Sequence, residues 1–546
     1  MKKAVSFIIF LFFLPNLNLL YSQEKPKLVV GIVVDQMRYD YLYRFSEKYG
    51  ENGFKRLLND GFHAENTHYN YIPTYTAVGH SSIYTGTTPQ NHGIIGNNWY
   101  DKFLKKNIYC VDDANYTTVG SNSNAGNKSP YRLQTTTITD QLRLAQNLHS
   151  KTISVAIKDR SAILPGGHTA NAAYWFEGGK DGKWITSNFY RDTLPNWVLA
   201  FNNLKKADAY LKEEWNTYAP IETYTESIDD NNPYEGVFRG EKTPTFPHNI
   251  PVLKEKNGHT NLIKSIPAGN SLTTDFSLAA IQGENLGQTK NQTDFLAISY
   301  SSTDYVGHRY GVDSKEIEDT YIRMDLEIER LLNYLDKHIG KNNYTLFLTA
   351  DHAVAQTPNY LNSLKIPGGY FDLAEFKNFV QTLSKEKYNS ENIVENISNF
   401  QLFFNKETLK KLNLDQTAVE DFFAEELLFF ENVNKTITSH TLNTSEFSNG
   451  IYSLVQQGHN QKLSGNVYII PNHSVIGSGH KKTGTTHGSG YSYDTHVPLL
   501  FFGKGIKKGT SKKYYPIIDI APTLANLLQI EFPNGTTGKV IEEALN

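Results

Sequence analysis

Acidic and imidazole side chains follow several strand-like segments of this sequence. Carboxylates and imidazoles are ligands that Zn²⁺ and similar divalent ions bind in proteins. One Asp after a strand is usually a turn or cap residue, but Asp-x-x-x-His and Asp-His at equivalent strand ends would share one pocket. Such a set suffices for two ions with open positions, the clamp used in in-line phosphoryl displacement. The candidate ligands are Asp35, Asp304, His308, Asp351, His352 and His487.

A basic pair lies in the segment "IKDRSAILPGGH". Lys158 and Arg160 stand two residues apart, and we expect an extended backbone that points both toward one face and Asp159 toward the other. A paired ammonium and guanidinium forms a strong anion site. Alone, the pair fits a solvated edge equally well; beside a two-metal site it indicates phosphate binding.

A hydroxyl-rich stretch could supply a nucleophile. It reads "NYIPTYTAVGHSSIYTGTTPQNHGIIGNN" from Asn70 to Asn98. The stretch alone does not say which hydroxyl would react, because a weak nucleophile needs a base or a metal beside it.

The elements that position these residues follow a repeating pattern. Apolar, β-branched runs predict buried strands, and helical patterns at about 136–148, 315–338 and 517–530 lie between or after them. The alternation predicts an α/β fold with a mostly parallel central sheet flanked by helices on both faces. Ligands of such sheets bind at the carboxyl ends of the strands. The runs are Lys27–Asp35, Thr152–Asp159, Phe295–Asp304, Tyr344–His352 and Val497–Gly503.

The ends of the pattern and its interruptions suggest a domain plan. In residues 1–22 two lysines precede a short apolar run broken by Pro15, which fits a cleaved signal peptide better than a membrane span. Residues 23–546 are expected to form one α/β domain, with insertions at about 180–271 and 357–482 that cap the site. Cys110 is the only cysteine, so no internal disulfide forms. A net charge of -3 gives no basic surface for nucleic acid.

Taken in order, the motifs resemble the alkaline phosphatase superfamily. They are "VVDQMRYDYL", "PTYTAVGHSSIYTGTTPQNHGIIGNNWY", "KDRSAILPGGH", "SSTDYVGH", "TADHA" and "THGSG". More narrowly, they resemble the phosphate-irrepressible, PafA-type bacterial alkaline phosphatases. The motifs run from Asp35 to His487 and therefore span nearly the whole mature chain.

This resemblance implies an alkaline phosphatase-like fold and a role for each candidate. Thr76 matches the nucleophile, Asn97 contacts a phosphoryl oxygen, and Lys158 with Arg160 marks monoesterases. The implied reaction passes through a phospho-threonine at a two-zinc site. One zinc would be bound by Asp304, His308 and His487, and the other by Asp35, Asp351, His352 and the Thr76 oxygen. His168 and His496 receive no role.

The expected protein is an exported bacterial phosphatase, periplasmic or secreted. Its partners would be small-molecule phosphate monoesters, it would have no membrane span once mature, and a monomer is the simplest state. One alternative is a phosphodiesterase or nucleotide pyrophosphatase of the same superfamily. Another is a catalytically inactive, metal-stabilised surface binding protein. A sulfatase is disfavoured because "YCVDDAN" around Cys110 does not match C/S-x-P-x-R.

Overall fold

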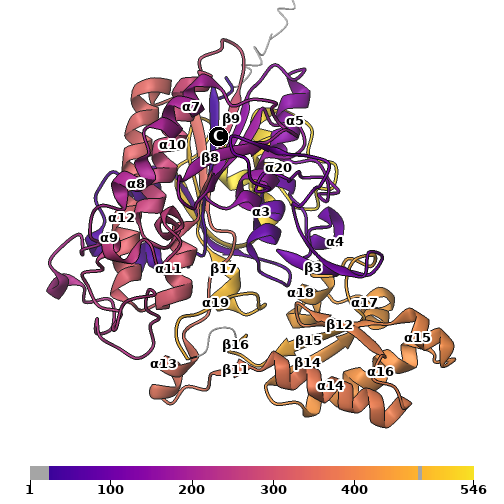
Figure 1. Cartoon of the computed structure of the whole chain (residues 1–546). Helices are drawn as coiled ribbons and strands as arrows, with labels where there is room; N and C mark the ends of the chain where they lie inside the picture. Colours follow the sequence, from indigo (N-terminus) through magenta and orange to yellow (C-terminus); the bar gives the residue numbers. More distant parts are fainter. Residues whose placement is uncertain (1–23, 478–481) are drawn as a thin grey trace, which may run out of the picture.

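One 11-stranded sheet runs through the larger part of the molecule (Figure 1). The computed structural model describes residues 24–477 and 482–546, so the predicted signal peptide lies outside the described residues. The central strands pair in parallel, as predicted, and they are buried on both faces. In spatial order they are β10 (Tyr344–Thr349), β1 (Leu28–Val34), β9 (Asp294–Tyr300), β6 (Thr152–Ala156) and β7 (Ala172–Glu177).

Antiparallel strands extend the sheet at both edges. β18 (Leu499–Gly503) pairs antiparallel with β10 and with β2 (Phe62–His68), and β8 (Lys183–Ser187) pairs antiparallel with β7. The parallel arrangement therefore describes the centre of the sheet. The remaining edge strands are β17 (His496–Val497), β5 (Thr118–Val119) and β19 (Gly509–Pro516), of which β19 pairs in parallel with β2.

Helices cover both faces of the sheet (Figure 1). The predicted helical segments form α5 (Ile138–Ala145), α12 (Lys315–Leu335) and α20 (Ile520–Leu528). Packing against neighbouring helices gathers them into two groups. One group contains α3 (Thr76–Thr85), α5, α6 (Asp159–Gly166) and α20, and the other contains α7 (Asn196–Asn203), α10 (Ala268–Glu284), α11 (Ser302–Tyr310) and α12. No helix among the described residues is long and apolar enough to cross a membrane.

The first predicted insertion, about 180–271, packs against the helices of the main domain. Its short helices α8 (Lys206–Tyr210) and α9 (Ile250–Leu253) are joined by irregular chain. Trp215 is buried, and its ring nitrogen donates to Asp319 of α12 at 2.8 Å. The segment thus extends the main apolar core.

The second predicted insertion forms a separate layer beside the sheet, which we call the cap (residues 357–477). Figure 1 shows it in orange below the main domain. It has its own four-stranded sheet in the order β12 (Val394–Ser398), β13 (Gln401–Phe404), β15 (Val467–Pro471) and β14 (Val433–Thr438). Helices α14 (Leu373–Tyr388) and α16 (Gln416–Glu426) bury Phe376 and Phe423 against this sheet. The short strand β16 (Val475–Gly477) lies at its end.

Candidate active site

The predicted ligands converge at the carboxyl ends of the central strands. Asp35 follows β1, Asp304 lies in the first turn of α11 just after β9, and Asp351 with His352 follows β10. Because β9, β1 and β10 are adjacent and parallel, these chain ends meet at one edge of the sheet. His487 joins them from a loop before β17.

Two groups of ligand atoms are close enough to hold metal ions. In one, the atoms of Asp35, Asp351 and His352 all lie within 4.8 Å of one another; in the other, Asp304 and His487 lie together with His352. The first group has the same members as one zinc site implied by the resemblance. In the second, His352 stands beside Asp304 and His487, while His308 Nε2 lies 3.1 Å from Asp304 Oδ1.

The burial of these groups fits a divalent cation. Asp35 and Asp351 are fully buried, and neither Asp35 Oδ1 nor Asp351 Oδ2 has a hydrogen-bond partner among the described residues. A buried carboxylate oxygen without a partner costs considerable free energy. A bound metal ion would satisfy both oxygens. Oxygen and imidazole donors together suit zinc.

The electrostatics of the site also suit metal ligation. Burial, and then the neighbouring His308, lower the pKa of His487 to about 3, and burial holds the pKa of His352 well below its usual range. Both rings are therefore neutral, which is the form that binds metals. Burial raises the pKa of Asp35 to about 6. Burial also opposes ionisation of Asp304, but the charges of His308 and Lys158 outweigh it and hold its pKa well below its usual range.

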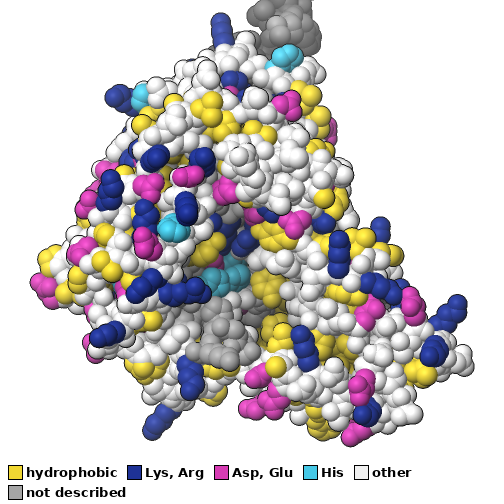
Figure 2. Space-filling model, in the orientation of Figure 1, with side chains coloured by type: hydrophobic (Ala, Val, Ile, Leu, Met, Phe, Trp, Pro, Cys, Tyr) yellow, Lys and Arg dark blue, Asp and Glu magenta, His cyan; other side chains and the backbone are white. Residues whose placement is uncertain are grey.

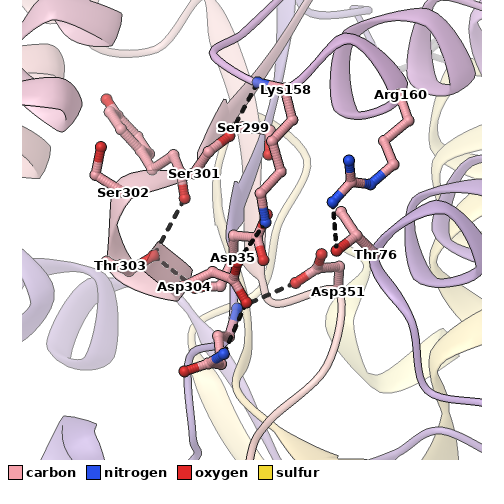
Figure 3. Close-up of polar contacts among 12 residues, drawn as sticks. Asp35, Thr76, Lys158, Arg160, Ser299, Ser301, Ser302, Thr303, Asp304 and Asp351 are labelled. Carbon is pink, nitrogen blue, oxygen red and sulfur yellow. Dashed lines mark hydrogen bonds and ion pairs between the residues drawn. The ribbon is translucent and has the colours of Figure 1, made fainter. Parts of the chain in front are cut away.

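Thr76 lies beside these groups at the start of α3. Its Oγ1 is 3.5 Å from His352 Nε2 and accepts a hydrogen bond from Arg160 Nη2 at 3.4 Å (Figure 3). The backbone N–H of Ala77 donates to Asn97 Oδ1 at 2.8 Å. This bond fixes the Asn97 amide next to Thr76 and leaves its NH₂ group as a donor for a ligand.

Other hydroxyls of the hydroxyl-rich stretch Asn70–Asn98 are engaged within the fold. Ser81 donates to the Ala77 carbonyl at 2.8 Å, and Thr85 donates to the Ser81 carbonyl at 2.7 Å. Ser82 Oγ lies 2.9 Å from His92 Nε2. These contacts stabilise α3 and its surroundings, whereas Thr76 Oγ1 faces the acids and imidazoles.

The basic pair reaches the site, although its backbone differs from the prediction. The expected extended segment is wrong: α6 begins at Asp159, with only Lys158 extended at its N-cap. An acid in the first turn suits the positive end of a helix. Lys158 Nζ lies 2.7 Å from Asp35 Oδ2 and 2.6 Å from Asp304 Oδ2, between the two ligand groups (Figure 3).

Sequence reasoning missed three residues that contact the site. Gln36 donates a hydrogen bond to each of two acids of the site. Its side-chain amide donates to Asp304 Oδ1 at 2.7 Å, and its backbone N–H donates to Asp351 Oδ1 at 3.1 Å. His80 lies one helical turn after Thr76, with Nδ1 2.8 Å from the Thr76 carbonyl. The spacing of His80 on α3 was a readable signal.

The third missed residue is Tyr109, which gave no signal because it is distant in sequence from its partners. Its hydroxyl donates to Asp159 Oδ1 at 2.5 Å and accepts from Arg160 Nη1 at 3.1 Å. The two histidines without a role lie elsewhere. His168 contacts Asp140, and the ring of His496 stacks between those of Tyr39 and His68.

Comparison with known proteins adds a family and several long matches. The profile of the family "Type I phosphodiesterase / nucleotide pyrophosphatase" matches residues 29–489. The alkaline phosphatase PhoV of Synechococcus elongatus is 48% identical over 95% of this chain and 93% of its own length. A Myroides odoratus protein with the name calcium-transporting ATPase is 47% identical, over 96% of this chain and 95% of its own.

One relative of similar coverage also has a solved structure. The alkaline phosphatase PafA of Elizabethkingia meningoseptica is 44% identical over 95% of each chain. The crystal structure of wild-type PafA superimposes with a TM-score of 0.92, covering 96% of this chain and 99% of the other. A murine ectonucleotide pyrophosphatase / phosphodiesterase, at 14% identity and a TM-score of 0.53, shares the fold alone.

Proposed function

Because the chain belongs to the type I phosphodiesterase / nucleotide pyrophosphatase family and, within it, to the PafA-type alkaline phosphatases, we propose that it is an exported, zinc-dependent phosphate monoesterase. One observation carries the proposal. The Thr76 hydroxyl lies beside the ligand group of Asp35, Asp351 and His352 and within hydrogen-bond distance of Arg160. A nucleophile, a metal site and an anion-binding cation therefore meet at one point.

Two zinc ions are the proposed cofactors. Asp35, Asp351 and His352 would hold one, together with the Thr76 oxygen. Asp304, His308 and His487 would hold the other. When bound, the ions would make the Thr76 hydroxyl more nucleophilic and stabilise the departing oxygen.

The chain's own groups then carry the reaction. Thr76 Oγ1 attacks phosphorus and gives up its proton, the bond from phosphorus to the ester oxygen breaks, and the alcohol departs with a proton on that oxygen, which leaves a phospho-threonine. The Asn97 amide and the Arg160 guanidinium bind phosphoryl oxygens, with help from the N–H groups at the start of α3. Water then attacks the phospho-threonine, releasing inorganic phosphate and restoring the Thr76 hydroxyl.

The choice between monoester and diester rests on charge. A phosphate monoester dianion carries one more negative charge than a diester and has no second organic group. Arg160 supplies a positive charge beside Thr76, and Lys158 adds a second one between Asp35 and Asp304. These charges favour the dianion, so we retain the diesterase as the second candidate only because the family includes such enzymes.

Hydrolysis of paired substrates tests the proposal. The purified mature chain is assayed with p-nitrophenyl phosphate and bis-p-nitrophenyl phosphate, and bound metal is measured on the same sample. We expect faster turnover of the monoester and zinc in the protein. Faster turnover of the diester would overturn the monoesterase. A zinc-loaded protein that hydrolyses neither would support the binding protein. ATP belongs in the panel because one relative has the name of an ATPase.

Location and partners follow from the same proposal. A signal peptide at 1–22 would direct the enzyme to the periplasm or the medium, where it would act on small-molecule phosphate monoesters. A monomer suffices, since every proposed site residue comes from one chain. Detection of the mature protein in a periplasmic or secreted fraction tests the location.

A further inference from the structure

A hairpin of the cap contacts the candidate active site. The turn between β12 and β13 consists of Asn399 and Phe400. Asn399 Nδ2 donates to the backbone carbonyl of Asn98 at 2.7 Å. Asn98 directly follows Asn97, so the tip of the hairpin rests on the segment that carries the proposed phosphoryl contact.

The backbone of this turn is unusual at Phe400. Asn399 and Phe400 have φ values of 50° and 56°, the left-handed pair that tightens a two-residue hairpin. Asn adopts this conformation readily, but a bulky aromatic residue seldom does. A side chain held in a rare conformation next to a candidate site is a reason to look for a function there.

Phe400 lines two adjoining pockets with Tyr75, the residue before the nucleophile. The first pocket lies between the cap and the core and is also lined by Ile469, Val475 and His487. The second continues along the cap past Phe371, whose ring lies 5.1 Å from that of Phe400. Figure 2 shows the hollow between core and cap, with histidine at its floor and hydrophobic side chains beside it.

The lining of the first pocket selects an uncharged group. Among its described residues there is no Lys, Arg or Glu. Its one acid among the described residues, Asp494, accepts hydrogen bonds at Oδ2 from the backbone of Gly488 at 3.1 Å and from the backbone and hydroxyl of Ser489 at 2.8 and 2.6 Å, while its Oδ1 has no hydrogen-bond partner among the described residues. Among the described lining residues, a second phosphate or a sulfate would therefore find no Lys or Arg to bind. The catalytic cations lie with Thr76 and the acids.

The size and position of the pocket narrow the occupant. It leaves about 60 Å³ of free volume. A single water needs roughly 10–15 Å³ of such volume, so the pocket has room for a small group of substrate atoms, and it continues into the second pocket. Tyr75 packs its ring edge-on against His487 at 5.9 Å. The pocket therefore begins at a proposed ligand of the zinc that would stabilise the departing oxygen.

We infer that Tyr75 and Phe400 line a subsite for the organic group of the substrate, and that this subsite favours phosphate monoesters of a single apolar or aromatic ring. The inference rests on the proposed monoesterase activity and specifies its substrate class. The phosphoryl group would face Thr76 and Arg160, and the ring would enter between the core and the hairpin tip of the cap.

The test compares ring and methyl substrates in a variant without the ring of Phe400. Phe400→Asn removes the ring and keeps a residue suited to positive φ. We expect kcat/KM for phenyl phosphate to fall about tenfold, a change equal to one decade of affinity, with methyl phosphate changed less than about twofold. Phe429→Asn is the control, because Phe429 is 81% exposed on the cap. Equal changes on both substrates, or none, would overturn the inference.

A binding measurement on the wild-type protein separates this inference from the proposed function. Phenylphosphonate should inhibit at least about tenfold more tightly than methylphosphonate, and Phe400→Gly, which also tolerates positive φ, should remove the difference. Equal inhibition by the two phosphonates in the wild type rejects the subsite even if no variant folds. Hydrolysis of neither phosphate monoester rejects the proposed function instead. Preference for a nucleoside monophosphate over phenyl phosphate would replace the single-ring substrate class.

Discussion

Arg160 donates to Thr76 Oγ1 from Nη2 at 3.4 Å and to the Tyr109 hydroxyl from Nη1 at 3.1 Å. The Tyr109 hydroxyl in turn donates to Asp159 Oδ1 at 2.5 Å. Burial, and then the charge of Asp159, hold the pKa of Tyr109 well above its usual range, so the phenol stays protonated and its oxygen remains an acceptor for Arg160. Tyr109 and Asp159 thus orient the guanidinium toward Thr76, the proposed nucleophile.

Tyr109→Phe should weaken this orientation without removing a group that touches substrate. We expect kcat/KM for a phosphate monoester to fall about tenfold, with zinc content unchanged. Because Arg160 is proposed to act on the phosphoryl group, the loss should be smaller for a diester. Tyr131→Phe, at a residue 53% exposed, is the control. An equal loss on monoester and diester would indicate a structural role only.

Thr76→Ala should remove most turnover. The substitution deletes the only proposed nucleophilic oxygen and keeps the helix start, so kcat should drop by at least about 10³-fold while metal content stays near that of the wild type. Ser81→Ala is the matched control, since the Ser81 hydroxyl bonds within α3. Undiminished turnover in Thr76→Ala would remove this residue from the mechanism.

Lys158→Ala combined with Arg160→Ala should change the substrate preference. Loss of two positive charges costs more for a dianion than for a monoanion, so we expect monoester kcat/KM to fall about 10²-fold further than diester kcat/KM. Rates on p-nitrophenyl phosphate and its bis ester measure the difference. If kcat/KM falls by the same factor for the monoester and the diester, Lys158 and Arg160 do not select the substrate by its charge.

The positions of the central strands and of the acids after them could be predicted from the sequence, because buried parallel strands are continuous apolar runs. The continuous apolar runs located β1, β9 and β10, and the rule that such strands bind ligands at their carboxyl ends brought Asp35, Asp304 and Asp351 together. The antiparallel edges were less readable, because β18 has the same apolar composition whichever direction it runs.

Contacts between segments that are distant in the sequence could not be predicted from it. Nothing near Tyr109 in sequence indicates that it binds Arg160, and nothing near Asn399 points to Asn98, a residue 301 positions away. Such contacts depend on how the cap and loops pack. The extended reading of Lys158–Arg160 failed for a local reason: an acid at Asp159 starts a helix as readily as it ends a strand.

Chelation should inactivate the enzyme and loosen its core. Asp35 Oδ1 and Asp351 Oδ2 are buried without hydrogen-bond partners among the described residues, so metal removal leaves these two oxygens unsatisfied. We expect nearly complete loss of hydrolysis, a lower Tm, and recovery of both on adding Zn²⁺. Full activity in metal-free protein, verified by elemental analysis, would end the two-zinc proposal.

Asp140 and His168 should link stability to pH away from the proposed zinc site. Asp140 caps α5 and accepts hydrogen bonds from Thr137, Thr169 and the His168 backbone. Its carboxylate outweighs burial and raises the pKa of His168 above its usual value of 6.5. A raised histidine pKa adds stability below about pH 6.5 that disappears as pH rises through the folded-state pKa.

His168→Gln should therefore lower Tm more at pH 6 than at pH 9. The side chain of His168 is 34% exposed, so solvent screening limits the effect to about 1 kcal/mol or less. Asp140→Ala should cost about 2–4 kcal/mol, because it leaves several buried donors without an acceptor, and the loss should be larger at pH 6, where it also removes the partner of protonated His168. Thermal unfolding of both variants and the wild type at the two pH values measures this, and a pH-independent loss in His168→Gln would show that its imidazole contributes by packing and not by charge.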